Sequence, residues 1–140
     1  MISEEVEIKM IKIPNPIYNA MVEHARKESP LECCGILGGK NGTVEKVFEL
    51  RNEEQSPVRY SMSPQDQLRI FDEMDKESLD MVAVYHSHTH TIPYPSETDV
   101  KLAFYPEVVS VIISLKEETP VMKAFRIKEN AISTEEIEVI

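Results

Sequence analysis

The chain has 140 residues and a net charge of −10, from 25 acidic and 15 basic side chains. This length suits one domain with a buried core, and the negative charge argues against nucleic acid or an anionic membrane as a partner. The two cysteines, Cys33 and Cys34, are adjacent and would point to opposite faces of a strand, which disfavours a bond between them. Free thiols, an acidic N-terminus and no apolar run of ~20 residues predict a cytoplasmic protein with no signal peptide or membrane span.

The first half of the chain predicts a strand, a helix and a hairpin. Residues 5–13 alternate weakly in polarity and predict a first strand. A helix is expected between Pro16 and Pro30. Its inward-facing residues should be Ile17, Met21, Val22 and Ala25. Residues 31–39 form an apolar strand, and Asn41-Gly42 is a hairpin turn signal before an alternating strand that carries Val44, Val47 and Phe48.

The second half opens with the clearest helix, over residues 63–78. Ser63 suits its N-cap, Pro64 its first position and Asp66 the reciprocal position of a capping box. Its buried stripe is expected to be Leu68, Phe71 and Met74. The remaining elements are a buried strand at 79–86, a capped helix at 96–105, a buried strand at 107–115 and a hairpin within 120–140 that turns near Lys128-Glu129-Asn130. Alternating strands and helices followed by a strand pair indicate an α/β protein with a mixed sheet and helices on its faces.

A cluster of histidines follows the buried strand at 79–86. Three of the chain's four histidines lie within five positions. His86 and His88 are two residues apart, so in an extended segment they point to the same side and can converge on one metal ion. Asp99 begins the next helix, and the intervening loop can return its carboxylate to the strand end, where α/β sheets commonly bind ligands. Two imidazoles and one carboxylate leave a fourth position open, as in catalytic zinc sites.

Each of these residues also has a plainer interpretation. A His-x-His pair alone is a weak metal signal. Ser96 and Asp99 form an S-x-x-D capping box that could simply start the helix. Glu32 opens an apolar strand, where a carboxylate is costly unless it is paired or acts as a general base; alternatively, it is the exposed first residue of that strand. The complete spacing is harder to produce by accident than any one part.

The complete spacing resembles the signature of the JAMM (MPN+) zinc metalloprotease family, also known as Mov34/MPN/PAD-1. That signature is a glutamate shortly before Cys-Gly, then His-x-His, seven residues, serine, two residues and aspartate. The matching residues are Glu32, Cys34-Gly35, His86, His88, Ser96 and Asp99. The resemblance implies that residues 1–140 form a single MPN (JAB) domain, a cytidine-deaminase-like α/β/α sandwich with a mixed central sheet.

The resemblance also implies a role for each signature residue. His86, His88 and Asp99 would hold one Zn²⁺ per chain. Glu32 would accept a proton from the attacking water and pass it to the leaving amine, and Ser96 would donate a hydrogen bond to the oxyanion. His90 is not at a ligand position of the family. Cys33 and Cys34 are expected to be small buried hydrophobes.

The substrate expectation rests on the same resemblance. The chain is similar to the compact prokaryotic branch, and "YHSHTHTIPYPSETDV" is similar to peptidases of ubiquitin-like sulfur-carrier proteins. These enzymes cut after the carrier's C-terminal Gly-Gly and release cysteine, a short peptide or a lysine-linked protein. Which adduct is cut, and whether the chain is a monomer or a homodimer, stays open.

Three other functions are alternatives. A non-catalytic MPN scaffold would not need the intact set of signature residues. A zinc nucleoside deaminase would need H-x-E with P-C-x-x-C, and neither occurs here. A 2-His-1-carboxylate iron oxygenase could share the three ligands, but it would not explain Glu32.

Overall fold

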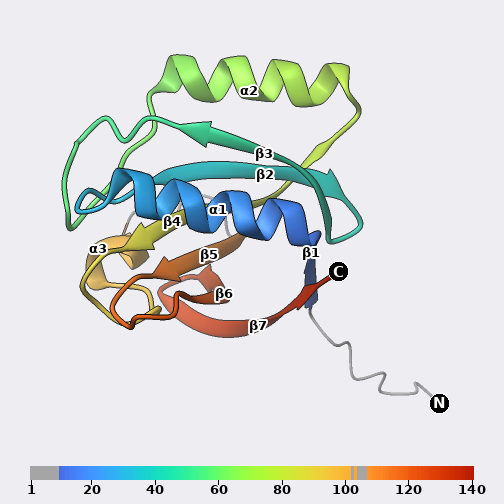
Figure 1. Ribbon diagram of the computed structural model, residues 1–140. Helices are drawn as coiled ribbons and strands as arrows, with labels where there is room; N and C mark the ends of the chain where they lie inside the picture. The colour runs from blue at the N-terminus through green and yellow to red at the C-terminus, as the bar shows by residue number, and fades with distance from the viewer. Residues whose placement is uncertain (1–9, 102, 104–106) are drawn as a thin grey trace.

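A computed structural model describes residues 10–101, 103 and 107–140 (Figure 1). The described residues form seven strands and three helices. The strands are β1 (Met10–Ile13), β2 (Cys34–Lys40), β3 (Thr43–Leu50), β4 (Asp80–His88), β5 (Val109–Ser114), β6 (Val121–Lys128) and β7 (Ala131–Val139). The helices are α1 (Asn15–Glu28), α2 (Pro64–Lys76) and α3 (Glu97–Lys101). Residues 5–9 of the first predicted strand, and residues 102 and 104–106 of the predicted helix at 96–105, lie outside this description.

The seven strands form one mixed sheet, as the sequence predicts. Their order is β1-β3-β2-β4-β5-β6-β7, and the sheet closes because β1 pairs in parallel with both β3 and β7. The closed barrel differs from the expected α/β/α sandwich. The seam at β1 and β3 is short, with one register pair, Lys12 with Thr43. β4 and β5 are parallel, whereas the hairpin pairs β2–β3 and β6–β7 are antiparallel.

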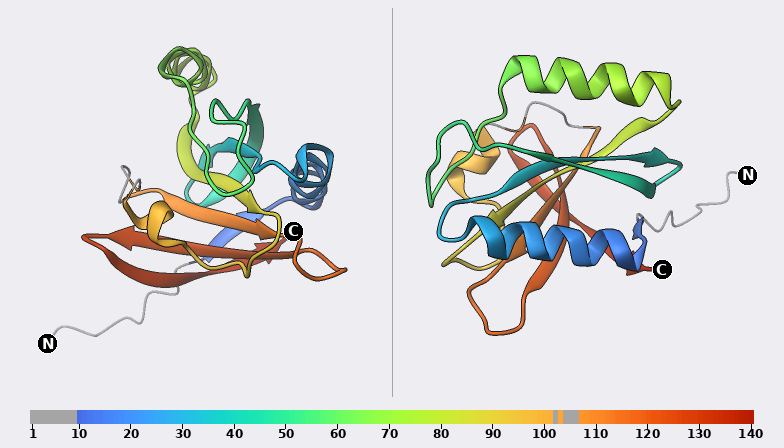
Figure 2. Two further views of the ribbon diagram at one scale, coloured as in Figure 1. Left: turned by 90° about the vertical axis from the view of Figure 1, so that its left-hand side faces the viewer. Right: turned by 45° about the horizontal axis from the view of Figure 1, so that its top comes forward.

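Helices α1 and α2 lie on opposite sides of β2 and β3 (Figure 2). Because side chains alternate along a strand, Leu37 of β2 joins the core cluster that contains Met21 of α1, whereas Ile36 joins the cluster beneath α2. Cys33 and Cys34 divide between the same two clusters, and both thiols are free and buried. The predicted inner face of α1 and the separation of the two cysteines are confirmed.

Helix α2 buries Phe71 and Met74 as predicted, but Ile70 takes the place of Leu68 in its buried stripe. Ile70 and Met74 are 1% and 4% exposed, and Phe71 packs partly buried against the same cluster. Leu68, predicted to be buried, is 67% exposed. Residues two apart on a helix differ by about 200° in direction, so a helix that rests on the sheet through Ile70 turns Leu68 toward solvent. The prediction for Leu68 is therefore wrong.

The predicted chain reversals are confirmed by backbone geometry. Asn41 and Gly42 have φ of 53° and 77°, as a two-residue hairpin turn between β2 and β3 requires. The Ser63 hydroxyl accepts a hydrogen bond of 3.0 Å from the Asp66 N–H and caps α2. Glu129 and Asn130 form the β6–β7 turn with φ of 51° and 65°.

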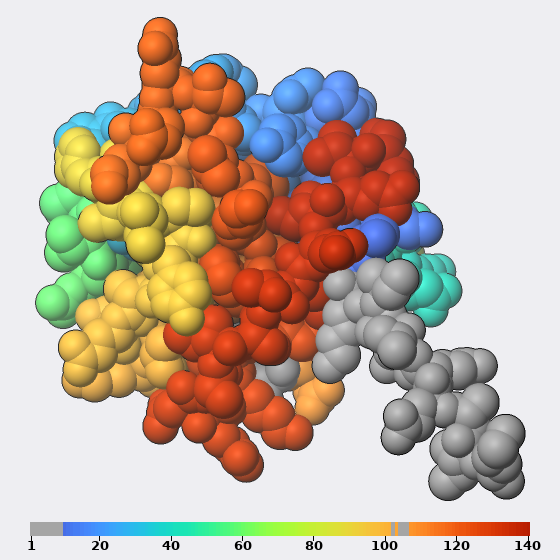
Figure 3. Space-filling view, turned by 90° about the horizontal axis from the view of Figure 1, so that it is seen from below, coloured from blue at the N-terminus to red at the C-terminus, as the bar shows by residue number. Residues whose placement is uncertain are grey.

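From below, β6 and β7 extend across the face of the molecule, with the segment that follows β4 beside them (Figure 3). In that segment Tyr94 packs edge-on against Phe125 of β6, with ring centroids 5.4 Å apart. This contact anchors the loop that connects β4 to α3. Among the described helices, none has the length and apolar character needed to cross a bilayer.

Candidate metal centre

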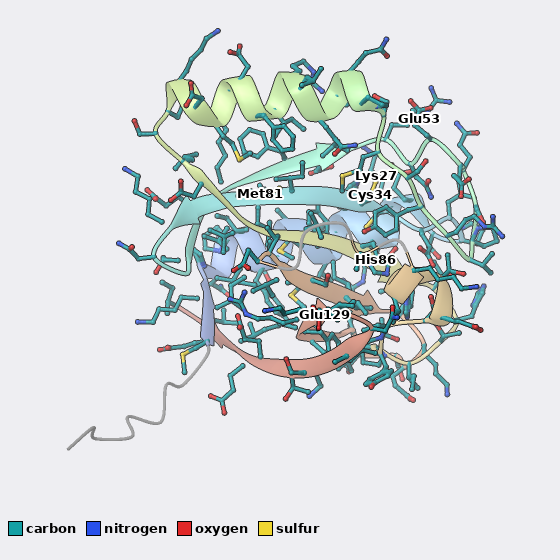
Figure 4. The ribbon with its side chains drawn as sticks, turned by 180° about the vertical axis from the view of Figure 1, so that it is seen from behind. Lys27, Cys34, Glu53, Met81, His86 and Glu129 are labelled. Carbon is teal, nitrogen blue, oxygen red and sulfur yellow. The ribbon has the colours of Figure 1, made fainter. Side chains whose placement is uncertain are left out.

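His86 and His88 lie at the C-terminal end of β4, whose neighbours in the sheet are β2 and β5. Figure 4 shows His86 on this strand. His86 is paired in register with Cys34 of β2 and with Ile112 of β5. The two imidazoles are 3% and 4% exposed. Strands on both sides therefore fix the backbone of His86, and β5 also pairs with His88.

The loop after β4 returns Asp99 to these histidines. The Asp99 Oδ2 lies 3.2 Å from His86 Nε2 and 3.0 Å from His88 Nε2, and the two Nε2 atoms are 3.2 Å apart. Within the described residues, these three form the one group of histidine, cysteine and acidic side chains close enough to hold a metal ion. The predicted ligand atoms thus converge on one point.

Surrounding hydrogen bonds orient the donor atoms. His88 Nδ1 donates to the Ile92 carbonyl oxygen at 2.9 Å, so the lone pair of the neutral imidazole is on Nε2, the atom that faces Asp99. Burial lowers the pKa of His88, but the hydrogen bonds with Asp99 and Ile92 and the negative charges of Asp99 and Glu32 together raise it. Burial likewise raises the pKa of Asp99, but hydrogen bonds with His86 and His88 hold it far below its usual range. An ionised carboxylate facing two imidazole nitrogens fits the ligand chemistry of Zn²⁺.

Glu32 lies two residues before the start of β2, and the charges of His88 and Asp99 act on its carboxyl group. Its neighbour Cys33 makes two hydrogen bonds with Ser87 of β4. The Cys33 N–H donates to Ser87 Oγ at 2.8 Å, and the Cys33 carbonyl accepts from the Ser87 N–H at 3.1 Å. Glu32 is 4% exposed, and its Oε1 is buried without a hydrogen-bond partner. Burial raises the pKa of Glu32 to about 8, against the opposing charge of His88. The alternative that Glu32 is merely the exposed first residue of its strand is therefore wrong. Among the described residues its Oε1 has no hydrogen-bond partner, so it is available to accept a proton.

Ser96 makes the capping contacts that the sequence predicts. Its hydroxyl oxygen accepts from the Asp99 N–H at 3.1 Å, and its backbone N–H donates to Asp99 Oδ2 at 2.8 Å. The capping box thus positions Asp99, one of the three candidate metal ligands. Because Ser96 Oγ acts as an acceptor in that bond, its own O–H can still donate elsewhere. His90 is exposed and lies outside the ligand group.

Two residues of the β3–α2 loop support the site and were missed from the sequence. Asn52 is 8% exposed; its Nδ2 donates to the Glu32 and Arg59 carbonyls, both at 3.0 Å. Tyr60 stacks on the His86 ring at a centroid distance of 4.6 Å and an angle of 26°. Nothing in the local sequence marks either residue, because their partners are distant along the chain.

A cavity of about 190 Å³ adjoins the ligand group. His86 and Asp99 form part of its wall, and Tyr60 forms another part. The apolar lining residues are Met62, Val84, Pro95, Ala103, Ile112 and Ile127. The metal-ligand group is thus open to an apolar space on one side.

The fold and the ligand group are those of a JAB-domain protein. The chain belongs to the family described as prokaryotic homologs of the JAB domain, whose model matches residues 14–128. It is 34% identical over 143 residues to the CysO-cysteine peptidase of Mycobacterium tuberculosis, covering 100% of this chain and 98% of that protein. It is also 37% identical over 90 residues to the desampylase of Pyrococcus furiosus, covering 64% of each chain. A solved protein of Desulfitobacterium hafniense superposes with a TM-score of 0.86 at 40% identity, covering 94% of this chain and 93% of that one.

Proposed function

We propose that this chain is a zinc-dependent peptidase that hydrolyses the amide bond after the C-terminal Gly-Gly of a ubiquitin-like or sulfur-carrier protein. The observation that carries this proposal is the unpartnered, buried Oε1 of Glu32, on whose carboxyl group the charges of His88 and Asp99 act, together with the converging donor atoms of His86, His88 and Asp99. A buried carboxylate without a partner is costly, so its presence supports a catalytic role.

Glu32, Ser96 and Asn52 would each have a separate role in hydrolysis. When bound, Zn²⁺ supplies Lewis acidity toward the scissile carbonyl and the attacking water. Glu32 accepts the water's proton at its carboxylate and delivers it to the leaving nitrogen. The ionised carboxylate that this step requires would be favoured by the neighbouring Zn²⁺. The Ser96 O–H donates to the oxygen that becomes negative in the transition state. Asn52 holds the backbone of Glu32 in place through the Glu32 carbonyl.

The substrate class is supported by the names of the relatives. A CysO-cysteine peptidase is a peptidase by name and matches this chain over its whole length, and a desampylase is a second relative. We place the activity in the cytoplasm, in one domain spanning residues 1–140, as a monomer or homodimer without a nucleic-acid or membrane partner. The products would be cysteine, a short peptide or a lysine-linked protein.

Cleavage of defined adducts tests this proposal. Recombinant ubiquitin-like carriers extended beyond their Gly-Gly are incubated with the zinc-loaded protein, with and without EDTA, and followed by intact mass spectrometry. We expect the zinc-loaded protein to release the extension. EDTA should abolish this cleavage, and Glu32→Gln should abolish it with zinc content unchanged. The exposed Glu138→Gln is the matched control and should cleave like wild type. If the zinc-loaded protein leaves every carrier intact, the alternative of a non-catalytic scaffold is favoured.

A further inference from the structure

The cavity beside the metal-ligand group has an apolar wall that hydrolysis itself does not require. Val84 of β4, Ile112 of β5 and Ile127 of β6 contribute its sheet side, and Met62 its loop side. Among its described lining residues, His86 and Asp99 belong to the metal-ligand group, and the other polar ones, Tyr60, Ser61, Gln67 and Ser110, are neutral at neutral pH. The cavity therefore offers no counter-charge to a charged side chain.

The size of the cavity suits one amino-acid side chain. Its volume is about 190 Å³. An engineered apolar cavity of about 150 Å³ in another protein binds benzene, so this one has room for a leucine, methionine or phenylalanine side chain. A cysteine side chain would leave much of it unfilled.

The position of the cavity indicates that it receives a residue from the nitrogen side of the scissile bond. Since His86 and Asp99 form part of its wall, the group that enters it must belong to a residue next to the reacting carbonyl. A Gly-Gly tail has no side chain there, and the next carrier residue is about 6–7 Å further along an extended chain. The residue bonded through the scissile nitrogen is the nearest one with a side chain to insert.

We propose that this cavity binds the apolar side chain of the residue that follows the scissile bond. The preferred leaving group is then an amino acid or peptide that begins with an aliphatic or aromatic residue. This inference rests on the proposed function and adds a leaving-group preference to it.

A panel of adducts tests the preference. One ubiquitin-like carrier ending in Gly-Gly is extended by a single glycine, cysteine, leucine, phenylalanine or aspartate, and a further adduct carries a lysine linked through its side-chain nitrogen. We expect kcat/KM for the leucine adduct to exceed that for the glycine adduct by about 10-fold or more. The aspartate adduct should be poorest, because its carboxylate would be buried near Asp99. Titration calorimetry with zinc-loaded Glu32→Gln should place the Kd values in the same order.

A filling substitution tests the location. Ser110 of β5 also lines the cavity, so Ser110→Leu should lower the leucine-over-glycine ratio of kcat/KM by about 10-fold. Ser133→Leu, on the exposed face of β7, is the matched control and should keep the wild-type ratio. If Ser110→Leu does not fold, the wild-type panel still decides the question.

The possible outcomes separate this inference from the function beneath it. If no adduct is cut, the proposed function fails. If all adducts are cut at equal rates, or the side-chain-linked lysine is preferred, the peptidase stands and the leaving-group preference is overturned.

Discussion

The strongest test of the site's electrostatics is the stability of Glu32→Gln in metal-free protein. The substitution keeps the shape of the side chain and removes its titration. Burial raises the pKa of Glu32 from its ordinary 4.5 to about 8. An acid with a raised pKa keeps its proton in the folded state while the unfolded chain releases it. Its contribution to stability is therefore fully present below pH 4.5 and is lost as pH rises through 8.

The magnitude follows from that pKa difference. At 1.36 kcal/mol per pKa unit, the wild type loses roughly 4–5 kcal/mol of unfolding free energy above pH 8, but less than about 1 kcal/mol by pH 5. We therefore expect the stability of the wild type relative to Glu32→Gln to fall by about 4 kcal/mol between pH 5 and pH 9. Saturating Zn²⁺ should shrink this fall, because a nearby cation favours the carboxylate.

The assay is urea unfolding with EDTA at pH 5, 7 and 9, followed by circular dichroism. Glu138→Gln, which removes an exposed carboxyl group, controls for the loss of a glutamate and should track the wild type at every pH. An equal difference between wild type and Glu32→Gln at pH 5 and pH 9 would show that the carboxyl is solvated, and the argument for its catalytic role would lose its basis.

Three further predictions concern the ligands, the backbone and a cap. His86→Ala should abolish stoichiometric zinc binding, measured by inductively coupled plasma mass spectrometry. A full zinc complement in this variant would show that His86 is not a ligand. Gly35→Ala should destabilise the fold by more than about 2 kcal/mol, because its Cβ would lie 2.1 Å from the Tyr85 ring carbon Cε2. Gly38→Ala, whose Cβ meets the Met74 sulfur at 3.2 Å, should cost less in the same thermal unfolding series, and equal costs would contradict the steric argument. Ser63→Ala should lower stability by about 1 kcal/mol, and an unchanged melting temperature would mean that the cap on α2 adds nothing.

The close approach of Tyr85 to Gly35 also gives a structural reason for glycine at that point of the chain. The Tyr85 ring occupies the space above Gly35, and its hydroxyl lies 2.8 Å from His24 Nδ1 of α1. A side chain at position 35 would displace this ring from the core. Because Gly35 follows Cys34 on β2 and Tyr85 precedes His86 on β4, the same contact keeps the two strands that carry the site in register.

Local signals predicted most of the secondary structure. The Ser63 cap, the Asn41-Gly42 turn and the inner face of α1 depend on residues within a few positions of one another, so one sequence is sufficient to identify them. The orientation of α2 was not predictable in the same way. Both a stripe through Leu68 and a stripe through Ile70 are apolar, and only the packing of the helix on the sheet selects Ile70. Barrel closure likewise depends on β1 meeting both β3 and β7, which are far apart in the chain.

For the site, the sequence alone determined the chemistry that is present: two imidazoles two residues apart on a strand, a carboxylate eleven residues later, and an acidic residue in an apolar segment. Only the tertiary structure decided that Glu32 is desolvated and that an apolar cavity adjoins the ligands. It also decided that Asn52 bonds to the Glu32 backbone and that Tyr60 stacks on His86. The physical reason is that strand periodicity acts between near neighbours, whereas burial and cavities are made by side chains brought together from distant parts of the chain.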